Sequence, residues 1–122
     1  MMGLAKALAR GIEKQGHTVD TFDGAKDLNI KLTIYQYIAI GAEVLGGFGG
    51  KIPDTVKNFL AAAGIVSGRK SYAFIAKSTF GAAKALARLM KCMEGEGMFL
   101  KNSDILRSPT EAEEVGRRLR IG

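Results

Sequence analysis

Two short stretches combine residue types that can bind a ligand through backbone groups, and each follows an apolar run. The first, GAEVLGGFGGKIP at residues 41–53, carries five glycines in thirteen positions directly after the run at 37–40. The second, KSTFG at residues 77–81, follows the run at 72–76 and adds two hydroxyls and an aromatic ring. Glycines let backbone amides approach a ligand closely, so phosphate binding is the first chemistry to test.

The known phosphate-binding spacings are absent from the glycine-rich stretch. A P-loop requires a glycine six positions before a lysine that is followed by Ser or Thr. Lys51 has Leu45 at that distance and is followed by Ile52. The dinucleotide fingerprint GxGxxG also fails, because Ile52 stands where a third glycine would follow Gly47 and Gly49.

The remaining reactive residues form no catalytic set. His17 has no second His or Cys nearby in sequence, so no zinc site is predicted. Cys92 lies at the margin of an apolar helix face, where a passive thiol is the favoured interpretation. Glu43 is the only carboxylate of the glycine-rich stretch, and a general base would need a partner that the sequence does not identify. We predict neither catalytic residues nor metal ligands.

Composition sets the class of protein. The chain has 122 residues, with 18 Lys and Arg against 12 Asp and Glu, and a net charge of +6. This length predicts a single domain over residues 1–122. A single cysteine, with neither a signal peptide nor an apolar run of membrane-spanning length, favours a cytoplasmic protein away from membranes. The basic residues form no cluster with interleaved aromatics, which disfavours nucleic acid as a partner.

Hydrophobic periodicity predicts alternating helices and strands. We expect helices at 3–15, 53–63, 81–94 and from 108 onward, and strands at 17–23, 37–40, 72–76 and 98–106, the last interrupted at 101–104. Residues 24–36 are left untyped, because Ile30, Leu32 and Ile34 alternate as in a strand without other strand signals. The alternation predicts an α/β fold with a parallel sheet covered on both faces.

Two of these elements carry more specific predictions. The apolar run at 37–40 is typical of a strand buried on both faces of a parallel sheet. Ser108-Pro109-Thr110-Glu111 matches a capping box with proline at the first helical position. Ligands of such sheets bind beyond the carboxyl ends of the strands, where the loops 41–52 and 77–81 emerge.

Four segments that together cover nearly the whole chain from Leu4 onward are AKALARGIEKQGHTVDTFD, YQYIAIGAEVLGGFGGKIPDTVKNFL, STFGAAKALARLMKCMEGEGMFL and SPTEAEEVGRRL. These segments resemble flavodoxin-like proteins. The strongest part of the resemblance is a strand followed by a glycine-rich loop, then Ile52-Pro53 and an amphipathic helix. The resemblance implies a three-layer, doubly wound α/β fold and electron transfer through FMN, together with a redox partner protein.

The resemblance also implies which residues face the cofactor. The glycine-rich loop would flank the flavin ring, with Phe48 as a stacking side chain. The implied FMN-binding residues are Gly41, Ala42, Glu43, Val44, Phe48, Gly49 and Gly50 in the first loop, and Ser78, Thr79, Phe80 and Gly81 in the second. Two plainer interpretations stay open: a mobile loop with Phe48 in the local core, and Ser78 or Thr79 as the N-cap of the following helix.

The chain departs from the family at its N-terminal end. Family members open with a strand whose Ser-, Thr- and Gly-rich loop surrounds the FMN phosphate. Aligned on AKALARGI, Met1 falls near the last residue of that loop. Either the sequence starts at an internal methionine of a longer protein, or the protein dispenses with the strand.

A missing strand predicts an exposed sheet edge or a rearranged sheet. Unpaired edges favour pairing with another chain, so we expect a homo-oligomer. Three function classes remain from the sequence: an FMN-linked electron carrier, a flavin-free oligomeric interaction module with the same fold, and a basic nucleic-acid binder, which the lack of a clustered basic face disfavours.

Overall fold

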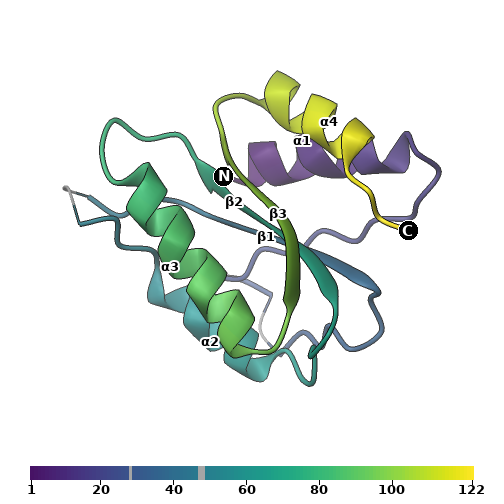
Figure 1. Ribbon diagram of the computed structural model, residues 1–122, viewed down its shortest axis with the longest axis horizontal. Helices are drawn as coiled ribbons and strands as arrows, with labels where there is room; N and C mark the ends of the chain where they lie inside the picture. The colour runs from purple at the N-terminus through teal and green to yellow at the C-terminus, as the bar shows by residue number, and fades with distance from the viewer. Residues whose placement is uncertain (28, 47–48) are drawn as a thin grey trace.

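The computed structural model describes residues 1–27, 29–46 and 49–122, which fold into helices on both faces of a parallel sheet (Figure 1). The sheet order is β1-β2-β3. Helices α1 and α4 lie on one face, and α2 and α3 on the other (Figure 1). The predicted α/β class is confirmed. In chain order the elements are α1 (Met2–Glu13), β1 (Tyr37–Ala42), α2 (Asp54–Ala62), β2 (Lys70–Ala76), α3 (Ala82–Gly95), β3 (Phe99–Leu106) and α4 (Pro109–Arg118).

Strand β2 is the centre of the core. Its residues 71–75 are all buried, and successive side chains point to opposite faces. Tyr72 and Phe74 face α1 and α4, with their rings stacked at a centroid distance of 5.8 Å. Ala73 and Ile75 face α2 and α3. This continuous burial is the pattern of a parallel strand covered on both faces, as predicted for 72–76.

Strand β1 lies at the edge of the sheet. It pairs in parallel with β2, from Tyr37 opposite Lys70 to Ala42 opposite Ile75. Ile38 and Ala42 are buried against the α2–α3 layer, but Ala39 is exposed. The prediction of a strand buried on both faces at 37–40 is therefore wrong, because the face of β1 that carries Ala39 is exposed at that position.

The predicted strand at 17–23 is also wrong, since this segment has no regular secondary structure. Its apolar side chains still pack: Val19 joins the α1–α4 layer, and the Phe22 ring meets Tyr35 edge-on at 6.2 Å. The segment ends in a turn in which the Asp23 carbonyl accepts the amides of Lys26 and Asp27. The β-branched residues of this segment therefore form no strand, because no neighbouring strand pairs with it.

The described residues of 24–36, a stretch that the sequence left untyped, form turns and irregular segments. Leu32 is buried and donates its N–H to the Ala63 carbonyl at 2.8 Å. Ile34 is 80% exposed. The alternation of Ile30, Leu32 and Ile34 therefore reflects one anchored residue between two less buried ones rather than a strand.

Strand β3 is continuous where an interruption was predicted at 101–104. Ser71 pairs with Leu100 and Tyr72 with Asn102, which leaves Lys101 as the extra residue of a bulge. The strand thus continues through the polar stretch with one irregularity in its pairing with β2. At the carboxyl end of β3, the Leu106 carbonyl accepts the N–H of Lys77 at 2.9 Å.

Helix α4 begins as the capping box predicted. Pro109 is its first residue, and the Ser108 hydroxyl oxygen accepts the Glu111 N–H at 3.2 Å. The Glu111 carboxylate accepts the Arg107 N–H at 2.8 Å, one residue earlier than in the standard box. Both bonds satisfy backbone donors that have no partner within the helix.

Helices α1 and α4 approach each other closely through two glycines. A Cβ on Gly11 would lie 2.8 Å from the Arg117 nitrogen, and one on Gly116 would lie 3.0 Å from the Ile12 nitrogen and overlap the Leu8 carbonyl. Beside this contact, Glu113 binds Lys14 at 2.8 Å and Arg10 at 3.1 Å. The hydrogen bonds from these two cations lower the pKa of Glu113.

We predict that Gly116→Ala destabilises the protein by about 1–3 kcal/mol, because the added methyl forces the two helix backbones apart. Gly3→Ala is the matched control in α1. Its Cβ would meet no atom within 4 Å, and the loss of a helical glycine should stabilise by about 0.5–1 kcal/mol. Urea unfolding of both variants measures the difference, and equal midpoints for the two would contradict the close-contact interpretation.

Candidate functional site

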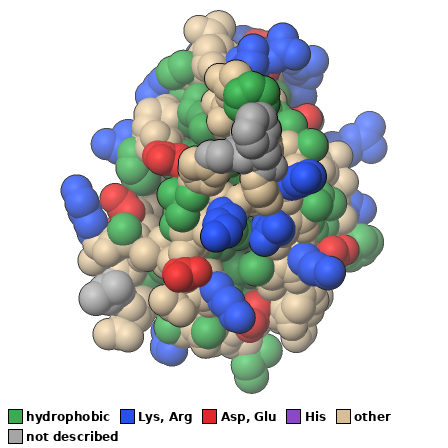
Figure 2. Space-filling view, turned by 90° about the vertical axis from the view of Figure 1, so that its left-hand side faces the viewer, with side chains coloured by type: hydrophobic (Ala, Val, Ile, Leu, Met, Phe, Trp, Pro, Cys, Tyr) green, Lys and Arg blue, Asp and Glu red, His purple; other side chains and the backbone are tan. Residues whose placement is uncertain are grey.

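The candidate site is the edge of the sheet where the parallel strands end. The loop from Glu43 to Pro53 leaves β1 there, and the loop 77–81 leaves β2. Helix α1 begins beside them, because the amino group of Met1 lies 3.5 Å from a carboxylate oxygen of Glu43. Figure 2 shows the left-hand side of Figure 1, onto which these strand ends open. We call this surface the carboxyl edge.

The two loops touch each other through a pair of glycines. Gly50 and Gly81 both have left-handed backbones, with φ of +65° and +80°. A Cβ on Gly50 would lie 2.9 Å from the Gly81 carbonyl oxygen, and a Cβ on Gly81 would lie 3.0 Å from the Gly50 nitrogen. Side chains at either position would separate the loops. Both residues were predicted cofactor contacts, and the structure brings them together.

A backbone bridge closes the glycine-rich loop at its base, and the described glycines of the loop differ in whether a side chain would have space. The Leu45 N–H donates to the Lys51 carbonyl at 2.7 Å in an antiparallel bridge. Gly50 is buried against α3, whereas Cβ atoms built on Gly46 and Gly49 would meet nothing within 4 Å. Gly46 and Gly49 therefore leave open space beside the backbone. Phe48 and Gly47 lie outside the described residues.

Three further residues that were predicted to contact the cofactor have packing roles, and two of them, Gly41 and Ala42, are the last residues of β1. The Phe74 ring occupies the space where Gly41 would carry a side chain. Ala42 is buried in the α2–α3 core, and Val44 packs against the same core. The sequence analysis missed this role of Gly41, although its register opposite Phe74 in the sheet provides the reason.

The second loop presents exposed groups and does not cap its helix through a side chain. The N-cap of α3 is Gly81, whose carbonyl accepts the Ala85 N–H at 2.9 Å, and no side-chain cap bond is present. The interpretation of Ser78 or Thr79 as the N-cap is therefore wrong, and both residues are exposed. Phe80 is 52% exposed.

Basic side chains surround these loops. Lys77 follows β2 directly, Arg107 follows β3, and Lys51 closes the glycine-rich loop. Lys84 lies in the first turn of α3, against Gly50. All four are exposed. Figure 2 shows Lys and Arg side chains gathered near the centre of this face.

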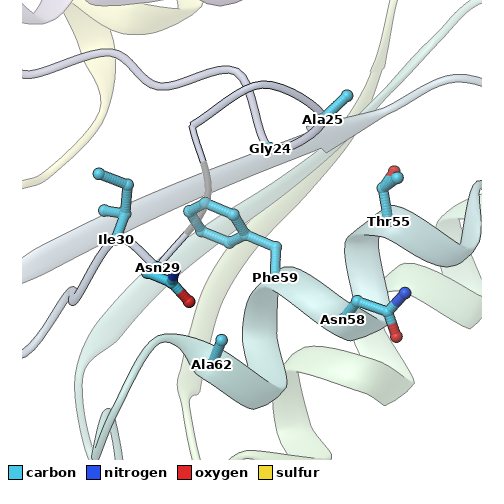
Figure 3. A pocket seen from close by; sticks show the side chains of 8 residues that line it. All are labelled: Gly24, Ala25, Asn29, Ile30, Thr55, Asn58, Phe59 and Ala62. Carbon is cyan, nitrogen blue, oxygen red and sulfur yellow. The ribbon is translucent and has the colours of Figure 1, made fainter.

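Two cavities lie away from this surface. One of about 290 Å³ lies between α2 and residues 24, 25, 29 and 30, with the Phe59 ring extending into it (Figure 3). Another, of about 440 Å³, lies at the amino ends of the strands beside Ile34 and Arg69.

The largest perturbations of titratable groups belong to tyrosines in the α1–α4 layer. Burial raises the pKa of Tyr37 to about 12. Burial, followed by the hydrogen bond to Asp104 at 2.9 Å, raises the pKa of Tyr72. Within the described ranges, no group of three His, Cys, Asp or Glu could hold a metal ion. In the same ranges, no helix is both long and apolar enough to cross a membrane.

Solved structures share this fold. The structure matches oxidised flavodoxin 1 from Bacillus cereus with a TM-score of 0.72 and 19% sequence identity, over 96% of this chain and 89% of the flavodoxin chain. It matches a flavodoxin from the domain Archaea with a TM-score of 0.70 and 18% identity, over 95% and 85% of the two chains. No family model and no curated protein sequence matches the chain. The fold is flavodoxin-like.

We predict that Gly50→Ala destabilises the protein by about 1–3 kcal/mol, because its left-handed backbone and its contact with α3 both disfavour a side chain. Gly49→Ala is the matched control in the same loop, and its open surroundings predict a change within about 0.5 kcal/mol. Thermal unfolding of the two variants provides the test. A stable Gly50→Ala protein would show that the loops are not held together by this contact.

Proposed function

We propose that this protein holds a flavin ring at the carboxyl edge and acts as an FMN-linked electron carrier. The observation that carries the proposal is the contact of Gly50 with Gly81, which joins the β1–α2 and β2–α3 loops at the strand ends of a flavodoxin-like sheet. Open α/β sheets bind ligands at this edge.

The described residues fit the ring of a flavin. Leu45 and Phe80, 45% and 52% exposed, supply apolar surface against which a ring can lie. The open backbone at Gly46 and Gly49 can bring N–H groups to the polar edge of the ring. The cofactor supplies the electron chemistry when bound. The protein's part is to orient the ring and to shield one face from water.

The phosphate end of FMN finds a weaker fit among the described residues. The N-terminus of α1 would attract a phosphate, but the Glu43 carboxylate lies 3.5 Å from the Met1 amino group there. Because this pair already neutralises the amino group, it leaves less positive charge there for a phosphate. We infer that the ring contributes most of the affinity, with the lysines of the edge adding a general attraction.

The test compares FMN with riboflavin, which has the same ring without the phosphate. We predict that both bind, with dissociation constants within about tenfold of each other, as measured by quenching of flavin fluorescence. Phe80→Ala should weaken both about tenfold through loss of aromatic contact. Phe99→Ala is the matched control. Phe99 is similarly exposed at 57%, but it is the first residue of β3 and therefore lies at the amino ends of the strands, away from the carboxyl edge.

Two outcomes would contradict the proposal. A protein that stays colourless with both flavins would exclude the electron-carrier function for this chain. Equal losses of flavin affinity in Phe80→Ala and Phe99→Ala would show that flavin binds without using the carboxyl edge.

A second candidate function, a flavin-free oligomeric interaction module, is favoured by the outer edge of β1. Among the described residues, the backbone hydrogen bonds of β1 go to β2, and Ala39 is exposed on the strand. Such an edge is a template for pairing with another strand. We propose that a second copy of this chain pairs along it.

Sedimentation velocity tests the pairing. We predict a concentration-dependent homodimer whose dissociation constant rises at least about tenfold in Ala39→Lys, because a charge on an edge strand opposes pairing. Ala87→Lys is the matched control, exposed on α3 away from the strand edge. A wild-type protein that remains monomeric over the accessible concentration range would refute this candidate function.

A further inference from the structure

We propose that the carboxyl edge docks an acidic partner protein, which approaches the loops that flank the flavin. The inference rests on the proposed function in that the partner exchanges electrons with the flavin held there. The docking itself follows from the charge and the apolar surface of this edge.

The basic groups of the edge come from all three strand ends. Lys77 continues from β2, with its N–H bonded to the Leu106 carbonyl at 2.9 Å, and Arg107 follows β3. Lys51 and Leu45 form the bridge that closes the loop after β1. Lys84, in the first turn of α3, packs its Cβ against Gly50. The sheet and the glycine contact therefore bring these cations to one surface.

These cations have no ion-pair partner among the described residues. Apart from the Met1–Glu43 pair, the ion pairs join side chains of α1 and α4, as in Arg10–Glu113, or neighbours within α4, as in Arg118–Glu114. Positive charge without internal partners is available to attract an oppositely charged surface.

Acidic groups near the edge do little to offset this charge. The Glu43 carboxylate pairs with the Met1 amino group. Glu111 accepts the backbone N–H of Arg107 at 2.8 Å and is half-buried. Asp54 is exposed at the start of α2, where a helix N-terminus favours its charge. Two of these three carboxylates are therefore already engaged within the protein.

Apolar surface lies among the basic side chains. Leu45 and Phe80 are large hydrophobic residues of the two loops and are 45% and 52% exposed. An apolar centre with a charged rim is the usual anatomy of a protein–protein interface. Single-stranded nucleic acid instead requires a series of aromatic side chains for base stacking, and Phe80 is the exposed aromatic that the described part of this edge offers. The edge therefore fits an acidic protein better than a nucleic acid.

The experiment uses fluorescein-labelled polyglutamate as the probe and measures anisotropy at low salt. The double variant Lys77→Glu, Lys84→Glu removes positive charge from the end of β2 and the start of α3. The matched control Lys70→Glu, Lys91→Glu makes the same change at the start of β2 and near the end of α3. We expect the first to weaken binding about tenfold and the second to leave it within about twofold of wild type.

Flavin is absent from this measurement, so its outcome is independent of the flavin titration. Equal weakening by both double variants would overturn the proposal, since binding would then follow net charge rather than the carboxyl edge. Tighter binding to a fluorescein-labelled oligothymidylate, weakened by the same Lys77 and Lys84 changes, would overturn it in favour of nucleic acid. Circular dichroism establishes that both double variants are folded.

Discussion

The burial of β2 on both faces is the constraint on which the rest of the structure depends. Residues 71–75 are removed from water, so each face of the strand must be covered by its own pair of helices. Tyr72 can be buried because its hydroxyl bonds to Asp104 on the neighbouring strand. The layer above Tyr72 is closed by α1 and α4, whose approach in turn requires Gly11 and Gly116.

The same strand determines the geometry of the carboxyl edge. Phe74 turns its ring into the α1–α4 layer and thereby occupies the side-chain space of Gly41, opposite it on β1. One residue of the core thus dictates a glycine where the first loop begins. Beyond β2, the bond from Lys77 to Leu106 extends the sheet to the point where the second loop departs. The Gly50–Gly81 contact is therefore held between loops whose bases are anchored in the core.

The sequence predicted what periodicity and end signals encode, and failed where tertiary contacts decide. Helix boundaries near Gly16, Gly64 and Pro109 follow from local chemistry, as does the buried run of β2. The state of residues 17–23 could not follow from β-branched content, because a strand exists only with a partner. Ser78 is a residue type that favours the N-cap, yet α3 begins at Ala82, so Gly81 occupies that position. At the site, the resemblance to flavodoxin-like proteins implied Gly50 and Gly81 as cofactor contacts but could not show that they meet.

The two candidate functions would use different surfaces, the carboxyl edge for a flavin and the outer edge of β1 for self-association. A flavin and an acidic partner would meet at the ends of the strands, among Leu45, Phe80 and the basic side chains. Self-association would run along the side of β1, where Ala39 is exposed. Because pairing along a strand leaves its end free, a dimer built on β1 keeps both carboxyl edges open. Loss of self-association would therefore leave the ligand edge intact, whereas separation of the Gly50–Gly81 loops would disable it in monomer and dimer alike.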